Sequence, residues 1–147
     1  MDKIDYRVKI EWIDIIEKSL YKVQIFEEEV FNFEVITQAI ADSSKSAIVT
    51  FVIVNIRRMN EANDLVAKIM IAVGFVVENF ENAFKKDENN SYPIPIEFEN
   101  TVKMMSISTM RGIMFSEFRG TRLHKAILPI ILADSLKPLE GKNINDL

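Results

Sequence analysis

The sequence contains no cysteine, a single histidine and only four glycines among 147 residues. Without cysteine the chain forms neither a disulfide nor a thiolate metal site, which fits a reducing compartment. A zinc site would need carboxylates almost alone, a ligand set that zinc rarely uses. The few glycines form no phosphate-binding loop. These absences argue against an enzyme, and we expect no catalytic residue, cofactor or metal.

Other classes of protein are disfavoured by charge and by the length of the apolar runs. The net charge is −4 and the 18 lysines and arginines are scattered, so nucleic acid is not an expected partner. The N-terminus lacks the pattern of a signal peptide. The longest apolar run, Leu65 to Val77, is shorter than the roughly 20 residues that span a bilayer. We therefore expect one cytoplasmic domain over residues 1–147 without membrane insertion, and His124, beside Lys125, as a surface residue.

The apolar run itself has a side-chain period of two, which is typical of a strand with a buried face. Its first face is entirely apolar: Leu65, Ala67, Ile69, Ile71, Val73, Phe75 and Val77. Its second face is smaller and mostly apolar: Val66, Lys68, Met70, Ala72, Gly74 and Val76. We predict permanent cover on the first face and a less permanent apolar contact on the second.

Three earlier segments alternate in the same way, over residues 4–12, 31–41 and 47–57. The first strand could continue to Tyr21 with a break, or residues 12–20 could be helical, because Ile13, Ile16 and Leu20 also share a helical face. Short connections between consecutive strands favour an antiparallel meander over residues 4–80.

The period becomes helical from Ile96 to about residue 119. Pro95 suits a helix start, and Gly120 can adopt the left-handed cap that ends one. The predicted apolar face contains Phe98, Val102, Met105, Met110, Ile113 and Met114. Small residues beside it allow another backbone to approach, in the sheet or in a partner chain. The residues predicted at an oligomer interface are Ser106, Thr109, Gly112 and Ile113.

An apolar segment from Leu123 to Leu136 follows the helix, and Pro129 within it indicates an extended chain rather than a helix. Residues 137–147 have the composition of a loose tail. Two strands are apolar on both faces, yet one helix is available to cover them. Uncovered apolar surface marks an interface or a binding groove.

The order of these elements and one motif resemble the SecB family of preprotein-export chaperones and its SecB-like relatives. The motif is Arg119-Gly120-Thr121 at the helix end, followed by the apolar stretch to Pro129. Residues 72–76 resemble the glycine and phenylalanine stretch of the family's fourth strand, and Arg111 stands near the arginine inside the family's helix. The resemblance covers about residues 6–136.

The sequence also departs from the family pattern. The aromatic–proline block at the helix start is absent, and the loop lacks the usual asparagine and phenylalanine around its proline. Few residues follow Leu136, so compared with the family pattern we expect a second helix to be short or missing. These differences favour a divergent SecB-like protein over the housekeeping export chaperone, and they weigh against engagement of the SecA motor.

The resemblance implies an α+β fold, in which a four-stranded antiparallel sheet carries one long C-terminal helix on one face, followed by an extended apolar loop. It implies a homotetramer, a dimer of dimers, that binds unfolded polypeptides in apolar grooves without ATP. The groove candidates are Leu123, Ile127, Leu128 and Ile130, with Met70, Ala72 and Val76 on the second face of the sheet. The alternatives are a chaperone dedicated to one client such as a toxin–antitoxin pair, a carrier of small apolar ligands and, last, an enzyme dependent on His124.

Overall fold

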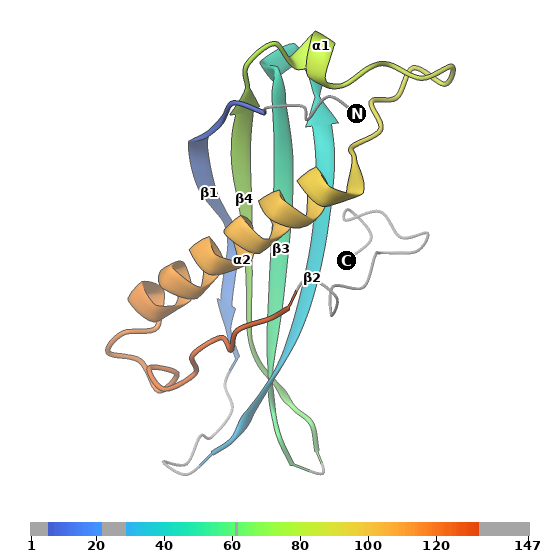
Figure 1. Ribbon diagram of the computed structural model, residues 1–147. Coiled ribbons are helices and arrows are strands. Elements are labelled where there is room, and N and C mark those ends of the chain that lie inside the picture. The colour runs from blue at the N-terminus through green and yellow to red at the C-terminus, as the bar shows by residue number, and fades with distance from the viewer. Residues whose placement is uncertain (1–5, 22–28, 61, 133–147) are drawn as a thin grey trace.

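The computed structural model describes residues 6–21, 29–60 and 62–132. Four strands form one antiparallel sheet: β1 (Val8–Leu20), β2 (Phe31–Asp42), β3 (Ala47–Arg58) and β4 (Leu65–Val77). A 3-10 turn, η1 (Ser43–Lys45), joins β2 to β3, and a short helix, α1 (Phe80–Ala83), follows β4. The long helix α2 (Ile96–Glu117) crosses one face of the sheet (Figure 1). This confirms the predicted α+β fold.

The strand order is β1-β4-β3-β2. Strands β2, β3 and β4 form the predicted meander, but the prediction is wrong for β1, which lies at the opposite edge from β2. There Val8 pairs with Val77 and Leu20 with Ala67. Short connections suggested a β1–β2 pair, whereas the observed order places β4, the strand with two apolar faces, between two neighbours. The result is the spatial order of a Greek key.

β1 is a strand as far as Leu20, so the helical alternative for residues 12–20 is wrong. Its register against β4 shifts between Ile10 and Trp12 and again between Ile15 and Glu17. Each irregularity places an extra residue in β1 and breaks the strict alternation of its side chains. The two breaks explain why the apolar residues of this strand have a spacing that imitates a helix.

The core lies between the sheet and α2. The side chains of β4 that were predicted to be covered, from Ile69 to Phe75, are fully buried in the same cluster as Val102, Met110 and Met114 of α2. The prediction that Met105 shares this face is wrong, because its side chain is 45% exposed. The buried stripe passes through Ser106, Ile107 and Met110 instead, which leaves Met105 on the outward face.

An aromatic cluster fixes the start of α2 at the end of the sheet. The ring of Phe98 lies 4.7 Å from that of Tyr6 and 5.2 Å from that of Phe84, measured between centroids. Phe84 also packs against Phe80 of α1 at 5.2 Å. Since aromatic pairs contribute beyond their buried area, this cluster anchors α2 across the sheet. No helix in the described ranges is long and apolar enough to cross a membrane.

Candidate functional site

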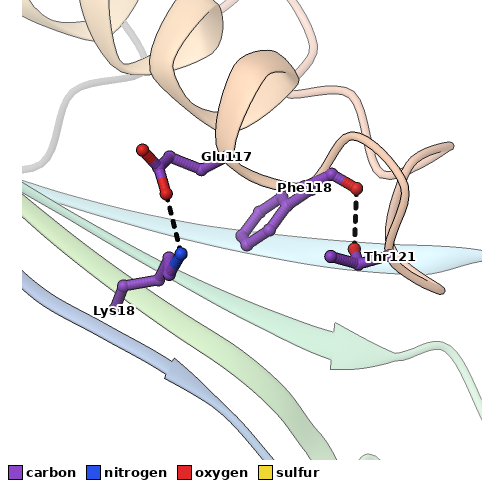
Figure 2. Close-up of polar contacts among 4 residues, drawn as sticks. All are labelled: Lys18, Glu117, Phe118 and Thr121. Atoms are coloured by element: carbon purple, nitrogen blue, oxygen red, sulfur yellow. Dashed lines mark hydrogen bonds and ion pairs between the residues drawn. The ribbon is translucent and has the colours of Figure 1, made fainter.

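Helix α2 ends in a turn built by Arg119-Gly120-Thr121. Gly120 has φ 77°, the left-handed conformation that glycine adopts without a steric penalty. The hydroxyl of Thr121 donates to the carbonyl of Phe118 at 2.7 Å (Figure 2) and accepts from the amide of Leu123 at 3.1 Å. This turn reverses the chain, which then returns beside the helix on the same face of the sheet (Figure 1).

Two polar contacts fasten the turn to the edge strand β1. Nζ of Lys18 lies 2.7 Å from Oε2 of Glu117, at the end of the helix (Figure 2). The guanidinium of Arg122 donates to the carbonyl of Tyr21, just beyond β1. These contacts hold the C-terminal end of α2 beside β1.

Residues 126–132, which we call the strap, run extended after this turn, as predicted from Pro129. Arg111 of α2 anchors the strap: its Nε donates to the carbonyl of Leu128 at 2.8 Å and its Nη2 to that of Pro129 at 2.9 Å. Ala126 is also buried. The sequence located Arg111 but assigned no contact to it, and nothing in its local pattern shows that it reaches residues so far along the chain. The rest of the predicted segment, residues 133–136, and the predicted tail lie outside the described residues.

The four groove candidates that follow α2 separate into two pairs. Leu123 and Leu128 are fully buried and belong to the core cluster. Ile127 and Ile130 are 55% and 83% exposed. Within the strap, Ile127 projects outward between two buried neighbours. Of these four candidates, Ile127 and Ile130 are the ones accessible to a partner.

Met70, Ala72 and Val76 alternate with the core residues of β4 and so lie on the sheet face opposite α2 and the strap. A hollow of about 540 Å³ opens on this face, and Ala72 lines it together with Trp12 and Phe51. The structure therefore does not bring the seven predicted groove residues together. Ile127 and Ile130 are exposed on the α2 side of the sheet, and Met70 and Val76 are half-buried on the opposite side. The other three, Leu123, Leu128 and Ala72, are buried.

Edge strand β1 is an apolar surface that the sequence analysis did not identify. Five of its side chains are between 39% and 50% exposed: Ile10, Ile13, Ile15, Ile16 and Leu20. The sequence of β1 does contain a sign of this surface: isoleucines lie on both faces of a strand that also carries charged residues. Such a pattern fits an edge strand better than a central strand.

The outward face of α2 is a third exposed apolar surface. It contains Met105 and Phe115, which are 45% and 60% exposed, and Gly112 lies between them. A methyl group added to Gly112 would meet no atom within 4 Å. A second helix could therefore approach this face closely.

The four predicted interface residues occupy different positions around α2. Gly112 lies on the outward face, and Thr109 and Ile113 are half-buried at its borders. Ser106 is fully buried toward the sheet, where its hydroxyl donates to the carbonyl of Val102 at 2.7 Å. The small residues were predicted to let another backbone approach, either in the sheet or in a partner chain. Ser106 faces the sheet, and Gly112 is open to a partner chain.

His124 is exposed, as predicted, and a ring nitrogen lies 3.0 Å from the carbonyl of Thr121. Within residues 6–21, 29–60 and 62–132, no group of three or more histidines and carboxylates is placed to hold a metal ion. Lys103 and Glu99, 2.6 Å apart, form an ion pair along one side of α2.

A four-stranded antiparallel sheet crossed by one long helix and followed by an extended apolar strap is a SecB-like fold. The structure of the Mycobacterium tuberculosis SecB-like chaperone Rv1957, in complex with a ChAD peptide from the Rv1956 HigA1 antitoxin, matches 86% of this chain and 91% of that chain with a TM-score of 0.58. The two sequences are 17% identical, so the match shows the fold. No protein-family model and no curated protein sequence matches this chain.

Proposed function

We propose that this protein is a passive, ATP-independent holdase chaperone that binds apolar segments of non-native polypeptides in the cytoplasm. The observation that carries the proposal is the apolar surface left outside the core, on the strap, on β1 and on the second face of the sheet. Burial of such surface contributes about 25 cal/mol per Å² without any chemical step. The shared fold with a chaperone solved with a bound peptide supports the same function.

The proposed client contacts lie on both sides of the sheet. Ile127 and Ile130 on the strap are the first surface, because they are exposed beside the buried core. Met70, Ala72 and Val76 belong to the second, with the hollow beside Trp12. The buried candidates Leu123 and Leu128 would contact a client only after the chain that follows α2 moves.

We also propose that the chain forms a homotetramer, a dimer of dimers, in which the outward faces of α2 meet. Gly112 leaves room for a second helix, and Met105 and Phe115 flank it with apolar side chains. Thr109 and Ile113 form the border of this interface, whereas Ser106 supports it from the sheet side.

A chaperone dedicated to one client is the second candidate. The Rv1957 structure contains a peptide from one antitoxin, which favours a defined client for this fold over export through SecA. Affinities for several unrelated apolar peptides would separate the candidates: similar values indicate a generalist, and one value at least a hundredfold tighter indicates a dedicated chaperone. A stoichiometric lipid-sized adduct in native mass spectrometry would instead indicate a small-ligand carrier.

Protection of a chemically unfolded client from aggregation, followed by light scattering, tests the proposed function. We expect the wild-type protein to protect the client at severalfold excess. Replacing Ile127 and Ile130 by serine removes two apolar contacts of about 1.5 kcal/mol each, so we expect at least a tenfold loss of apparent affinity. The matched control is Met59→Ser, at a side chain that is 65% exposed beyond β3. Absence of protection by the wild type contradicts the proposal.

A further inference from the structure

The strap occupies its place as a bound extended peptide would. Ala126 and Leu128, two positions apart, point into the core, and Ile127 between them points outward. These three residues alternate as an extended chain does. Beyond Pro129 the alternation stops, since Ile130 is 83% exposed and Ile131 packs against the core. Leu128 belongs to the same buried cluster as Met110 and Met114 of α2. Methionine adapts its shape to different neighbours, so a core that contains Met110 and Met114 tolerates apolar side chains of more than one shape.

Among the described residues, few polar contacts hold the second half of the strap. Residues 128–132 form no backbone–backbone hydrogen bond with the described part of the chain. The two hydrogen bonds from Arg111 to the carbonyls of Leu128 and Pro129 are therefore its polar anchor. A guanidinium donates charge-assisted hydrogen bonds in a fixed fork. Because this fork contacts main-chain carbonyls, the same contact is open to any extended polypeptide whatever its sequence.

We propose that the strap is an internal competitor for clients and that Arg111 is the latch that holds it in place. A client that displaces the strap would offer its own carbonyls to Arg111 and place two apolar side chains, two positions apart, where Ala126 and Leu128 now lie. Arg111 is thus a positioning residue: it determines how readily the strap leaves the place that a client would occupy. The inference rests on the proposed chaperone function, although the latch itself can be measured without a client.

The absence of cysteine from the sequence makes strap opening directly measurable. A cysteine introduced by Leu128→Cys is the only thiol in the chain, and it reacts with a maleimide only when the strap leaves its seat. We expect slow modification of this variant and at least tenfold faster modification after Arg111→Ala. Arg111→Lys, which keeps the charge but loses the fork, should give an intermediate rate. The matched control is Arg7→Ala, which removes an exposed arginine just before β1, outside the turn and the strap.

A second thiol probe separates strap opening from unfolding. Val102 is fully buried on α2 against the sheet, so Val102→Cys reports on the opening of the core. Faster modification at residue 128 alone supports the latch. An unchanged rate at residue 128 after Arg111→Ala, or equal acceleration at residue 102, overturns it.

Competition is tested with a synthetic peptide that has the sequence of residues 123–132 of this chain. We expect the peptide to accelerate modification of Leu128→Cys at least fivefold. We expect it to bind the Arg111→Ala variant about as tightly as the wild type, because that substitution removes the same two hydrogen bonds from the strap and from the peptide. A peptide with aspartate in place of the leucine at position 128 should neither accelerate modification nor bind. Binding of aggregating clients without any change in the modification rate overturns the competitor role but leaves the proposed function. Failure to bind clients, with a normal effect of Arg111→Ala, overturns the function but leaves the latch.

Discussion

The indole ring of Trp12 lies against the backbone of Gly74, its partner across the β1–β4 pair. A methyl group added at Gly74 would overlap the Cε2, Cδ2 and Cζ2 atoms of that ring. The ammonium group of Lys45 lies 5.1 Å from the ring centroid. Glycine is therefore required in the middle of β4 by close approach, and Trp12 forms part of the wall of the hollow on the second face.

We predict that Gly74→Ala destabilises the protein by about 1–3 kcal/mol through overpacking, although alanine in a strand is ordinarily more stable than glycine. Urea denaturation measures the change in the free energy of unfolding. In a protein that already carries Trp12→Leu, adding Gly74→Ala should cost much less stability than it does in the wild type. A double variant that shows the full loss would contradict the steric explanation.

The outward face of α2 gives a prediction about assembly. Gly112→Ala adds a helix-favouring residue where there is open space, so we expect it to stabilise an isolated subunit by about 0.5–1 kcal/mol. Gly112→Leu should prevent close approach of a second helix and reduce the mass measured by light scattering after size-exclusion chromatography. Gly112→Ala is the matched control for this mass. Unchanged mass for Gly112→Leu would remove this face from the proposed interface.

The ion pair between Lys18 and Glu117 should contribute little. Both side chains are partly exposed, by 39% and 32%, and pairs of this kind contribute about 0–1 kcal/mol. A double-mutant cycle with alanine, measured by urea denaturation, should give a coupling energy below about 1 kcal/mol that falls with added salt. A larger coupling energy would show that this contact has a greater part in holding the helix end beside β1.

Asp42 gives a prediction about acid stability. The Ser44 hydroxyl, followed by backbone amides and the charge of Lys45, lowers the pKa of Asp42 below its ordinary value of 3.8, against the opposing effect of burial. A lowered pKa in the folded state stabilises the protein above the unfolded-state pKa, and this contribution is lost as the pH falls through the folded-state value. We predict that Asp42→Asn is less stable than the wild type at neutral pH and that the difference shrinks below about pH 4. A constant difference across this range would contradict the assignment.

Periodicity predicted the four strands and the long helix, and the resemblance to the SecB family implied how the helix lies on the sheet. The alternation in β4 identified its covered face correctly, and Pro95 and Gly120 marked the two ends of the region that contains α2. The position of β1 could not be predicted in this way, because local pattern does not show which of two edges a strand joins. Met105 was misplaced for a related reason: its helical spacing fits an apolar face, but the crossing of α2 over the sheet decides which stripe is buried.

The candidate site was less predictable than the fold. The sequence identified the segment after α2 as apolar and extended. It could not show that Leu128 is buried and Ile127 exposed, because neighbouring side chains of an extended chain point in opposite directions and both residues are apolar. The anchoring of this segment by Arg111 depends on the return of the chain beside the helix. Such a contact joins residues with no shared pattern, so only the folded chain reveals it.

The pairing of β1 with β4 has a consequence for biosynthesis. Val8 pairs with Val77, so β1 has no partner in the sheet until β4 has also left the ribosome. At about 5–20 residues per second this delay lasts several seconds. During this interval the isoleucine-rich N-terminal segment of the nascent chain is itself exposed to aggregation, and a protein proposed to shield other chains passes through the same vulnerable stage.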